Sequence, residues 1–221
     1  MRHRLVSIFT GRPAAPAVLA AALLASPAAA GDWTLAVEKQ GVKVWTRQAQ
    51  GVDVREVRAE STFDLPAPRI LAMLADVGSY SRLMPLTDES RLLRRDGRAA
   101  WFYMVIDPPW LSHRDFCIRT WQWRREDGAL VSEWATDEAG CPAPRPGMVR
   151  ILRNEGRWTL TALDEGTTVV GYEALTDPGG NVPKWMVNMG TPGSLVNVFT
   201  ALRKAAELPE YEAAARPEEE R

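Results

Sequence analysis

The stretch Asp177-Pro-Gly-Gly-Asn-Val-Pro183, followed by residues 184–208, decides the fold of this chain. The Asp-Pro-Gly-Gly run ends an extended segment, and Pro183 suits a first helical turn because its φ is fixed and its missing N–H would have no helical partner there. Apolar residues then recur at helical spacing in two stripes. The stripes are Val182, Met186 and Met189, then Leu195, Val198, Phe199, Leu202 and Ala206. The Thr191-Pro-Gly193 run between the stripes predicts a kink or two stacked helical pieces.

An apolar helix of this length needs a broad surface to cover, and the segments before it read as strands of a sheet. Their β-branched and aromatic runs are separated by turn signals. Strands are expected at 42–47, 54–63, 90–94, 99–106, 114–125, 129–136, 148–154, 157–163 and 167–176, with a short helix at 69–75 and a helical or irregular lead-in at 32–40. The sequence therefore predicts an α+β fold, a curved antiparallel sheet of about eight or nine strands gripping a long C-terminal helix.

Residues 1–30 differ in kind from the rest of the chain. Arg2, Arg4 and Arg12 precede an apolar stretch that ends in an Ala-x-Ala site at Ala30, which is typical of a secretory signal peptide. The alternatives are an uncleaved anchor and a misassigned start codon before a cytosolic domain. We expect cleavage after Ala30 and an exported protein of the bacterial periplasm, with one folded domain at 31–208 and a charged tail at 209–221.

The charge balance argues against several classes of partner. The chain has 27 Lys plus Arg against 28 Asp plus Glu, and no basic stripe interleaved with aromatic residues, so nucleic-acid binding is not expected. No Gly-rich phosphate loop leads from a strand into a helix, and no metal-ligand spacing is present. We expect no cofactor, no metal and a monomer.

Cys117 and Cys141 have two alternative states. In an oxidising compartment they can pair, and a bridge across this sequence separation would add about 3 kcal/mol by restricting the unfolded chain. A strand cysteine is equally expected to be buried and inert. The sequence leaves both states open.

Several motifs resemble START domains, the steroidogenic-acute-regulatory-protein-related lipid-transfer family within the Bet v 1-like helix-grip superfamily. The resemblance rests on the order of elements, on Leu74-Ala-Asp-Val-Gly-Ser-Tyr80, on Arg114-Asp-Phe116 with Tyr172, and on the run from Asp177 to Asn188. It covers nearly all of residues 33–208. It implies a helix-grip fold with a deep apolar tunnel between the sheet and the last helix, holding one lipid and transferring it after transient contact with a membrane surface.

The resemblance and the period-two alternation of strand side chains give a set of expected ligand-binding residues. The set is Trp101, Tyr103, Val105, Phe116, Ile118, Thr120, Trp158, Tyr172, Met186, Met189, Val198 and Leu202. Pro108, Pro109, Trp110 and Leu111 are expected to form a lid over the tunnel. Trp110 could instead cap the core.

One departure from the family concerns charge inside the tunnel. Family members often place an acidic and a basic side chain opposite each other there, and a gapless alignment puts those positions on Trp101 and Thr120, with Arg119 pointing to the opposite face. An unpaired buried charge is costly. The sequence therefore predicts a ligand with little charge, such as a sterol-like, hopanoid-like or fatty lipid.

Two alternatives to lipid transfer remain at the level of sequence. Some members of the superfamily are polyketide cyclases or aromatases that use a few polar groups in the same cavity. Such an enzyme would depend on Tyr103, His113 or Glu173, although we expect no catalytic residues. The other alternative is a filled core without a cavity, in a protein that acts only through protein contacts.

Overall fold

The computed structural model describes residues 32–51, 54–109, 111–180, 182 and 184–215, without the side chains of 184–191 and 215. Its helical elements are α1 (Ala67–Ala75), η1 (Val77–Ser79), α2 (Tyr80–Leu83), α3 (Lys184–Ala206) and η2 (Pro209–Ala215). Its strands are β1 (Thr34–Lys39), β2 (Val42–Gln48), β3 (Arg55–Phe63), β4 (Thr87–Asp96), β5 (Ala99–Ile106), β6 (Arg114–Arg124), β7 (Leu130–Thr136), β8 (Val149–Arg150), β9 (Arg153–Ala162) and β10 (Thr168–Asp177).

Within the described residues, ten strands form a single sheet. The strand order is β1-β2-β3-β10-β9-β7-β6-β5-β4, and the short β8 pairs with β6 off this path. The neighbours along the main path are antiparallel, whereas β8 runs parallel to β6. Because β3 pairs with β10, the first three strands join the last strand in the middle of the sheet. Strands β1 and β4 are therefore its two edges.

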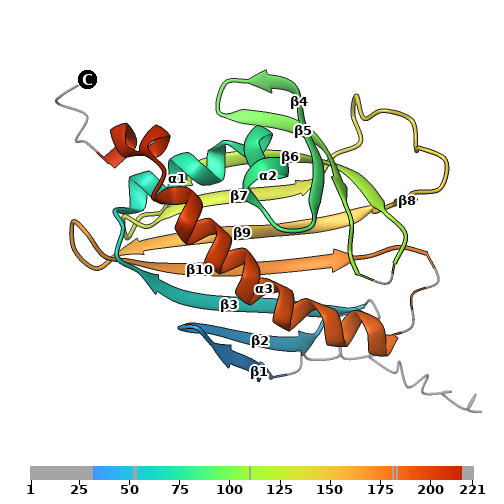
Figure 1. Cartoon of the computed structure of the whole chain (residues 1–221), viewed down its shortest axis with the longest axis horizontal. Coiled ribbons are helices and arrows are strands. Elements are labelled where there is room, and N and C mark those ends of the chain that lie inside the picture. The colour runs from blue at the N-terminus through green and yellow to red at the C-terminus, as the bar shows by residue number, and fades with distance from the viewer. Residues whose placement is uncertain (1–31, 52–53, 110, 181, 183, 216–221) are drawn as a thin grey trace, which may run out of the picture.

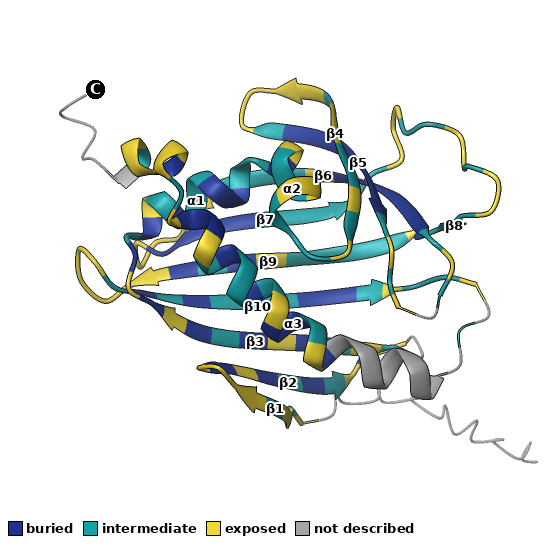
Figure 2. Ribbon diagram, in the orientation of Figure 1, coloured by how far each residue is buried: buried dark blue, intermediate teal, exposed yellow. Residues whose placement is uncertain are grey.

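Helix α3 lies diagonally across one face of the sheet, called here the inner face, with α1 and α2 beside it (Figure 1). Buried positions recur along α3 where it faces the strands, and along the strands beneath it (Figure 2). Phe199 and Leu202 of α3 are fully buried in the same core cluster as Phe63 and Leu160. Burial of this apolar stripe stabilises the fold, and the predicted sheet gripping a C-terminal helix is confirmed.

Two local expectations were wrong, and one of the two alternatives for α3 is excluded. Residues 34–39 are an edge strand and not a helical or irregular lead-in. Glu155 and Gly156 lie inside the continuous β9 and not in a turn between two strands. Thr191-Pro-Gly193 lies inside one helix, so the alternative of two stacked pieces does not occur.

The folded part extends beyond the boundary expected at residue 208. Tyr211 of η2 is buried in the main core cluster, and its hydroxyl donates to Asp76 Oδ2 at 2.8 Å. Arg82 pairs with Glu210 at 2.7 Å. The start of the expected charged tail therefore packs on α1 and α2 as part of the domain, whereas residues 1–30 and 216–221 lie outside the described residues.

Candidate functional site

A pocket of about 240 Å³ lies between the inner face of the sheet, the α1–α2 segment and α3. Its apolar walls come from several elements. They include Leu74, Val77, Met84, Met104, Ile106, Phe116, Ile118, Ile151, Trp158 and Val198. Sites for apolar ligands have this composition, with a few polar groups that fix the ligand's orientation. This pocket is the candidate functional site.

Strand register determines which side chains reach the pocket. Met104 lies directly opposite Phe116, and Phe102 lies opposite Ile118. Directly opposed residues in an antiparallel pair project from the same face, so these side chains share the inner face.

An aromatic group closes the floor of the pocket. Tyr172 lies opposite Trp158 in the ladder, with ring centroids 4.6 Å apart, and stacks on Trp134 at 5.6 Å. Trp158 also meets Phe199 of α3 at 5.3 Å. Gly156 makes this arrangement possible, because a Cβ there would lie 2.5 Å from the ring of Trp134. The glycine that resembled a turn residue gives space to an indole.

The polar groups in the pocket are uncharged apart from Glu133, which also borders it. Asn154 Oδ1 accepts hydrogen bonds from Trp134 Nε1 and Thr176 Oγ1, both at 3.1 Å. The Tyr80 hydroxyl donates to the carbonyl of Leu74 at 3.0 Å. Burial raises the pKa of Tyr80 and of Tyr172 above the ordinary phenol value, so both hydroxyls stay protonated at neutral pH.

Half of the expected ligand-binding residues line this pocket. They are Phe116, Ile118, Thr120, Trp158, Tyr172 and Val198. Leu202 is instead fully buried in the core. Met186 and Met189 lie outside the side chains that the structure describes.

Trp101, Tyr103 and Val105 do not line the pocket, and their predicted inward orientation was wrong. Tyr103 lies opposite Cys117 and Trp101 lies opposite Arg119, so all three project from the face opposite to Phe116 and Ile118. Their places on the inner face are taken by Phe102, Met104 and Ile106. Period two identified the two faces of β5 correctly but could not show which one turns inward.

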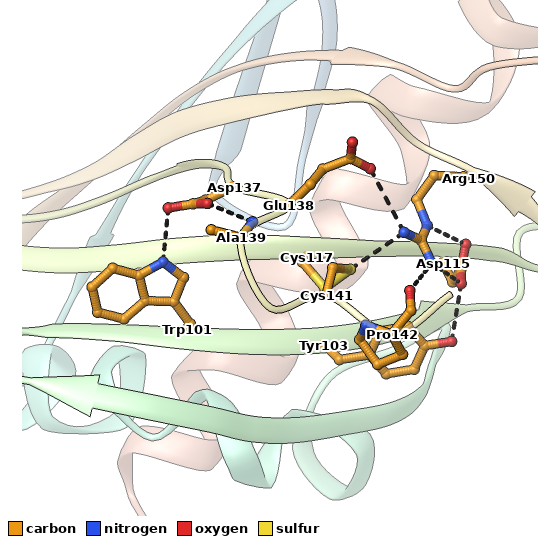
Figure 3. Close-up of a disulfide and its surroundings, with 10 residues drawn as sticks. All are labelled: Trp101, Tyr103, Asp115, Cys117, Asp137, Glu138, Ala139, Cys141, Pro142 and Arg150. Carbon is orange, nitrogen blue, oxygen red and sulfur yellow. Dashed lines mark hydrogen bonds and ion pairs between the residues drawn. A yellow bond between two sulfur atoms is a disulfide. The ribbon is translucent and has the colours of Figure 1, made fainter. Parts of the chain in front are cut away.

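The outer face of β5 carries a buried polar cluster (Figure 3). Asp115 is fully buried and accepts two hydrogen bonds from Arg150, at 2.9 and 2.8 Å, and one from the Tyr103 hydroxyl at 3.0 Å. Trp101 Nε1 donates to Asp137 at 2.8 Å. These partners satisfy the polar atoms of the residues that had been expected in the tunnel.

Of the two states left open for the cysteines, the structure has the disulfide. Cys117 of β6 is joined to Cys141 in the loop between β7 and β8, which lies over Tyr103 (Figure 3).

Burial would raise the pKa of the Asp115 carboxyl, but the hydrogen bonds from Arg150 and Tyr103 outweigh burial and hold the pKa below its usual range. Asp115 is therefore an ionised structural group.

A larger hollow of about 460 Å³ lies on the outer face of the sheet. Its lining includes the ion pairs Arg47–Glu56 and Arg157–Glu173, and Glu173 is therefore an outward carboxylate. Three tryptophans, Trp33, Trp121 and Trp134, border it. Because its polar lining is already paired, the smaller apolar pocket is the better candidate for a lipid site.

The expected lid begins at the edge of the pocket, since Ile106 lines the pocket and Asp107 follows it. His113 Nε2 lies 3.1 Å from Asp107 Oδ1, so the two ends of the loop meet, and Asp88 lies 3.8 Å from the other ring nitrogen. These three side chains are exposed and include the kinds of ligand that a metal ion takes. Trp110 lies outside the described residues, and the lid function stays a prediction.

Sequence reasoning missed Asn154 and Trp134, the polar and aromatic groups that shape the floor of the pocket. Asn154, Gly156 and Trp158 alternate along β9 and share its inner face. That alternation was available in the sequence, but the turn expected at Gly156 interrupted it.

Comparison with known proteins places the chain in a family. The family described as polyketide cyclase / dehydrase and lipid transport matches residues 63–194. An uncharacterized protein of Pseudomonas aeruginosa is 33% identical over 193 residues, covering 86% of this chain and 95% of that protein. The chain therefore belongs to the polyketide cyclase / dehydrase and lipid transport family.

Solved structures share its fold. A STAR-related lipid transfer protein from Xanthomonas axonopodis has a TM-score of 0.73 at 29% identity, covering 80% of this chain and 99% of that one. Human STARD10 has a TM-score of 0.71 at 21% identity, covering 82% of this chain and 76% of that one. At this identity, the likeness concerns the fold alone. The resemblance to START domains is thereby confirmed.

Proposed function

We propose that this protein binds one apolar lipid in the inner pocket and carries it between membranes. The observation that supports this proposal is the composition of the pocket. Its walls are apolar and aromatic, and no Lys, Arg or His belongs to its described lining. Each methylene buried there would contribute about 0.8 kcal/mol to binding. Sterol-like, hopanoid-like and fatty lipids fit this environment better than a lipid with an unpaired charge.

The relatives support a carrier more than an enzyme. The Xanthomonas axonopodis relative is named as a lipid transfer protein. The family description also includes cyclases. However, Tyr103, His113 and Glu173, the residues on which a cyclase was expected to depend, all lie outside the pocket. Tyr80 and Tyr172 lie inside it, but their raised pKa values make them poor bases at neutral pH.

The compartment and the route of transfer are part of the proposal. The basic and apolar segments of residues 1–30 support export to a bacterial periplasm, where a carrier would act as a monomer after transient contact with a membrane. Among the described residues, no helix is long and apolar enough to cross a bilayer. The loop from Asp107 to His113, at the pocket edge, would move to admit the lipid.

Native mass spectrometry of the protein purified from its own envelope tests the proposal. We expect one lipid per chain, released and identified after extraction. The control is the same protein stripped of lipid and incubated again with envelope lipids, which should restore the bound mass. A chain that stays empty under both conditions would contradict the carrier function and favour an enzyme or an interaction protein.

A further inference from the structure

The orientation of the Asn154 side chain is fixed by its partners. The Trp134 indole nitrogen carries a hydrogen and can only donate, so the atom that it meets at 3.1 Å must be the amide oxygen of Asn154. Thr176 Oγ1 donates to the same oxygen at 3.1 Å. The amide oxygen is therefore occupied by two donors, and the two N–H groups of Nδ2 point elsewhere.

The backbone of Asn154 is held as firmly as its side chain. Its N–H donates to Thr136 Oγ1 at 2.7 Å, and the same hydroxyl donates to the Asn154 carbonyl at 3.2 Å. Asn154 lies directly opposite Thr176 in the ladder between β9 and β10. Three neighbours on β7 and β10 thus hold Asn154 in place, two through its side chain and one through its backbone, and a preorganised polar group binds a ligand at a low ordering cost.

The amide nitrogen of Asn154 has no hydrogen-bond acceptor within the described part of the chain. The structure also has no sealed, unpaired side-chain nitrogen or oxygen among those residues. Since Asn154 lines the pocket, Nδ2 reaches the pocket space. The hydroxyls of Ser132 and Tyr172, which also line the pocket, likewise make no hydrogen bond to the described residues.

These groups define the ligand chemistry that the pocket can satisfy. Nδ2 offers two donors, and the two hydroxyls can donate as well, but no cation of the described lining could balance an anion. A carboxylate or phosphate would lose its hydration without a charged partner. An ester or ketone carbonyl is neutral and accepts hydrogen bonds. It would satisfy Nδ2 at little desolvation cost.

We infer that Asn154 is the polar anchor of the pocket and that the ligand is a neutral lipid with a carbonyl or ester oxygen facing Nδ2. The inference rests on the proposed function and narrows it. It favours acyl esters over free fatty acids in their ionised form and over lipids whose phosphate would enter the pocket.

The substitution Asn154→Asp tests the inference with little change of shape. A carboxylate oxygen still accepts from Trp134 and Thr176, but the two N–H donors are lost. Glu155→Gln is the matched control, because it makes the opposite acid-to-amide exchange one residue later on the same strand. Glu155 lines the outer hollow and does not line the pocket. Thermal unfolding establishes that each variant is folded.

Calorimetric titration of the lipid-free protein uses four ten-carbon probes: methyl decanoate, 1-decanol, ionised decanoate and decane. For Asn154→Asp we expect methyl decanoate to bind about tenfold more weakly than to the wild type, the loss of one hydrogen bond. Decane should bind equally to both, and Glu155→Gln should bind all probes as the wild type does. The wild type should prefer the ester to decanoate.

A spectroscopic readout keeps the inference falsifiable if Asn154→Asp does not fold. The infrared carbonyl band of methyl decanoate labelled with ¹³C should move to lower frequency when bound to the wild type, relative to an alkane solution, because Nδ2 donates to it. An unshifted band would overturn the anchor. Equal losses of ester and decane binding in Asn154→Asp would overturn it as well, since they indicate altered shape. Failure of all four probes to bind the wild type would overturn the proposed function itself.

Discussion

The two faces of β5 are alike in burial and opposite in surroundings. Phe102 and Met104 on the inner face and Tyr103 and Val105 on the outer face are all at most 6% exposed. On the inner face, Met104 lines the pocket, and Phe102 packs in the same core cluster as Phe116 and Ile118. The outer ones lie under a loop that the Cys117–Cys141 disulfide ties to β6.

Polar partners distinguish the two faces more clearly than hydrophobicity does. Tyr103 and Trp101 each carry a hydrogen-bonding atom, and each finds a carboxylate, Asp115 and Asp137. Phe102 and Met104 need no such partner. The outer face therefore supplies a permanent structural core, whereas the inner face is suited to an exchangeable apolar ligand. The following predictions test this division of roles.

Removing the Asp115 carboxylate should have the largest effect. Asp115→Ala leaves the Arg150 guanidinium, whose side chain is 11% exposed, without its main partner. Breaking a buried ion pair in this way costs about 3–5 kcal/mol of unfolding free energy. Urea unfolding measures it. A loss below about 1 kcal/mol would contradict the assignment of the outer cluster to stability.

Removing the disulfide should cost about 3 kcal/mol of unfolding free energy, because the unfolded chain gains freedom. The double variant Cys117→Ser with Cys141→Ser tests this by urea unfolding. Neither cysteine lines the pocket, so the affinity for methyl decanoate should stay within about twofold of the wild type. A twofold change corresponds to less free energy than one hydrogen bond contributes. A large loss of binding would show that the outer face also shapes the pocket.

A bulky side chain should block binding only from the inner face. Ile118→Trp places an indole in the pocket and should weaken the binding of methyl decanoate by about tenfold or more. Arg119→Trp is the matched control, since it introduces the same side chain one residue later on the exposed outer face. Calorimetric titration compares them. Equal affinities would remove the distinction between the faces.

The smallest expected effect is a change in the stability contributed by Asp115 at acid pH. The pKa of Asp115 is lowered in the folded protein from its usual value of 3.8, so its stabilising contribution is complete above that value and is lost as the pH falls through the folded pKa. The stability difference between the wild type and Asp115→Asn should therefore shrink below about pH 4. Urea midpoints over this range measure it. A constant difference would contradict the ionised state of Asp115.

The sequence predicted most of the fold because turn signals and alternation agree along much of the chain. Arg95-Asp-Gly97 and the Asp177-Pro-Gly-Gly180 run mark real strand ends. Gly156 misled for a physical reason: the same missing Cβ that suits a turn also makes room for the Trp134 ring within a strand. Residues 34–39 were missed because an exposed edge strand has little apolar alternation.

The candidate site was predicted only in part, because its composition depends on register between strands. Phe116 and Ile118 on β6 were placed correctly, and their partners on β5 were placed on the wrong face. No local pattern states which residues of two strands are opposite each other. Asn154 could be proposed as a polar anchor only from the structure, where two neighbours bind its side-chain amide and a third binds its backbone.

The packing of Trp134 and Trp158 around Tyr172 gives the pocket an optical signature of its own. Two indoles this close to one phenol couple their electronic transitions, so near-ultraviolet circular dichroism should contain a band that belongs to the pocket floor. Trp101, Trp121 and other tryptophans absorb from the outer face and supply a constant background. For the proposed lipid carrier, the difference spectrum between lipid-free and loaded protein would therefore report occupancy in real time, without a label on either the protein or the lipid.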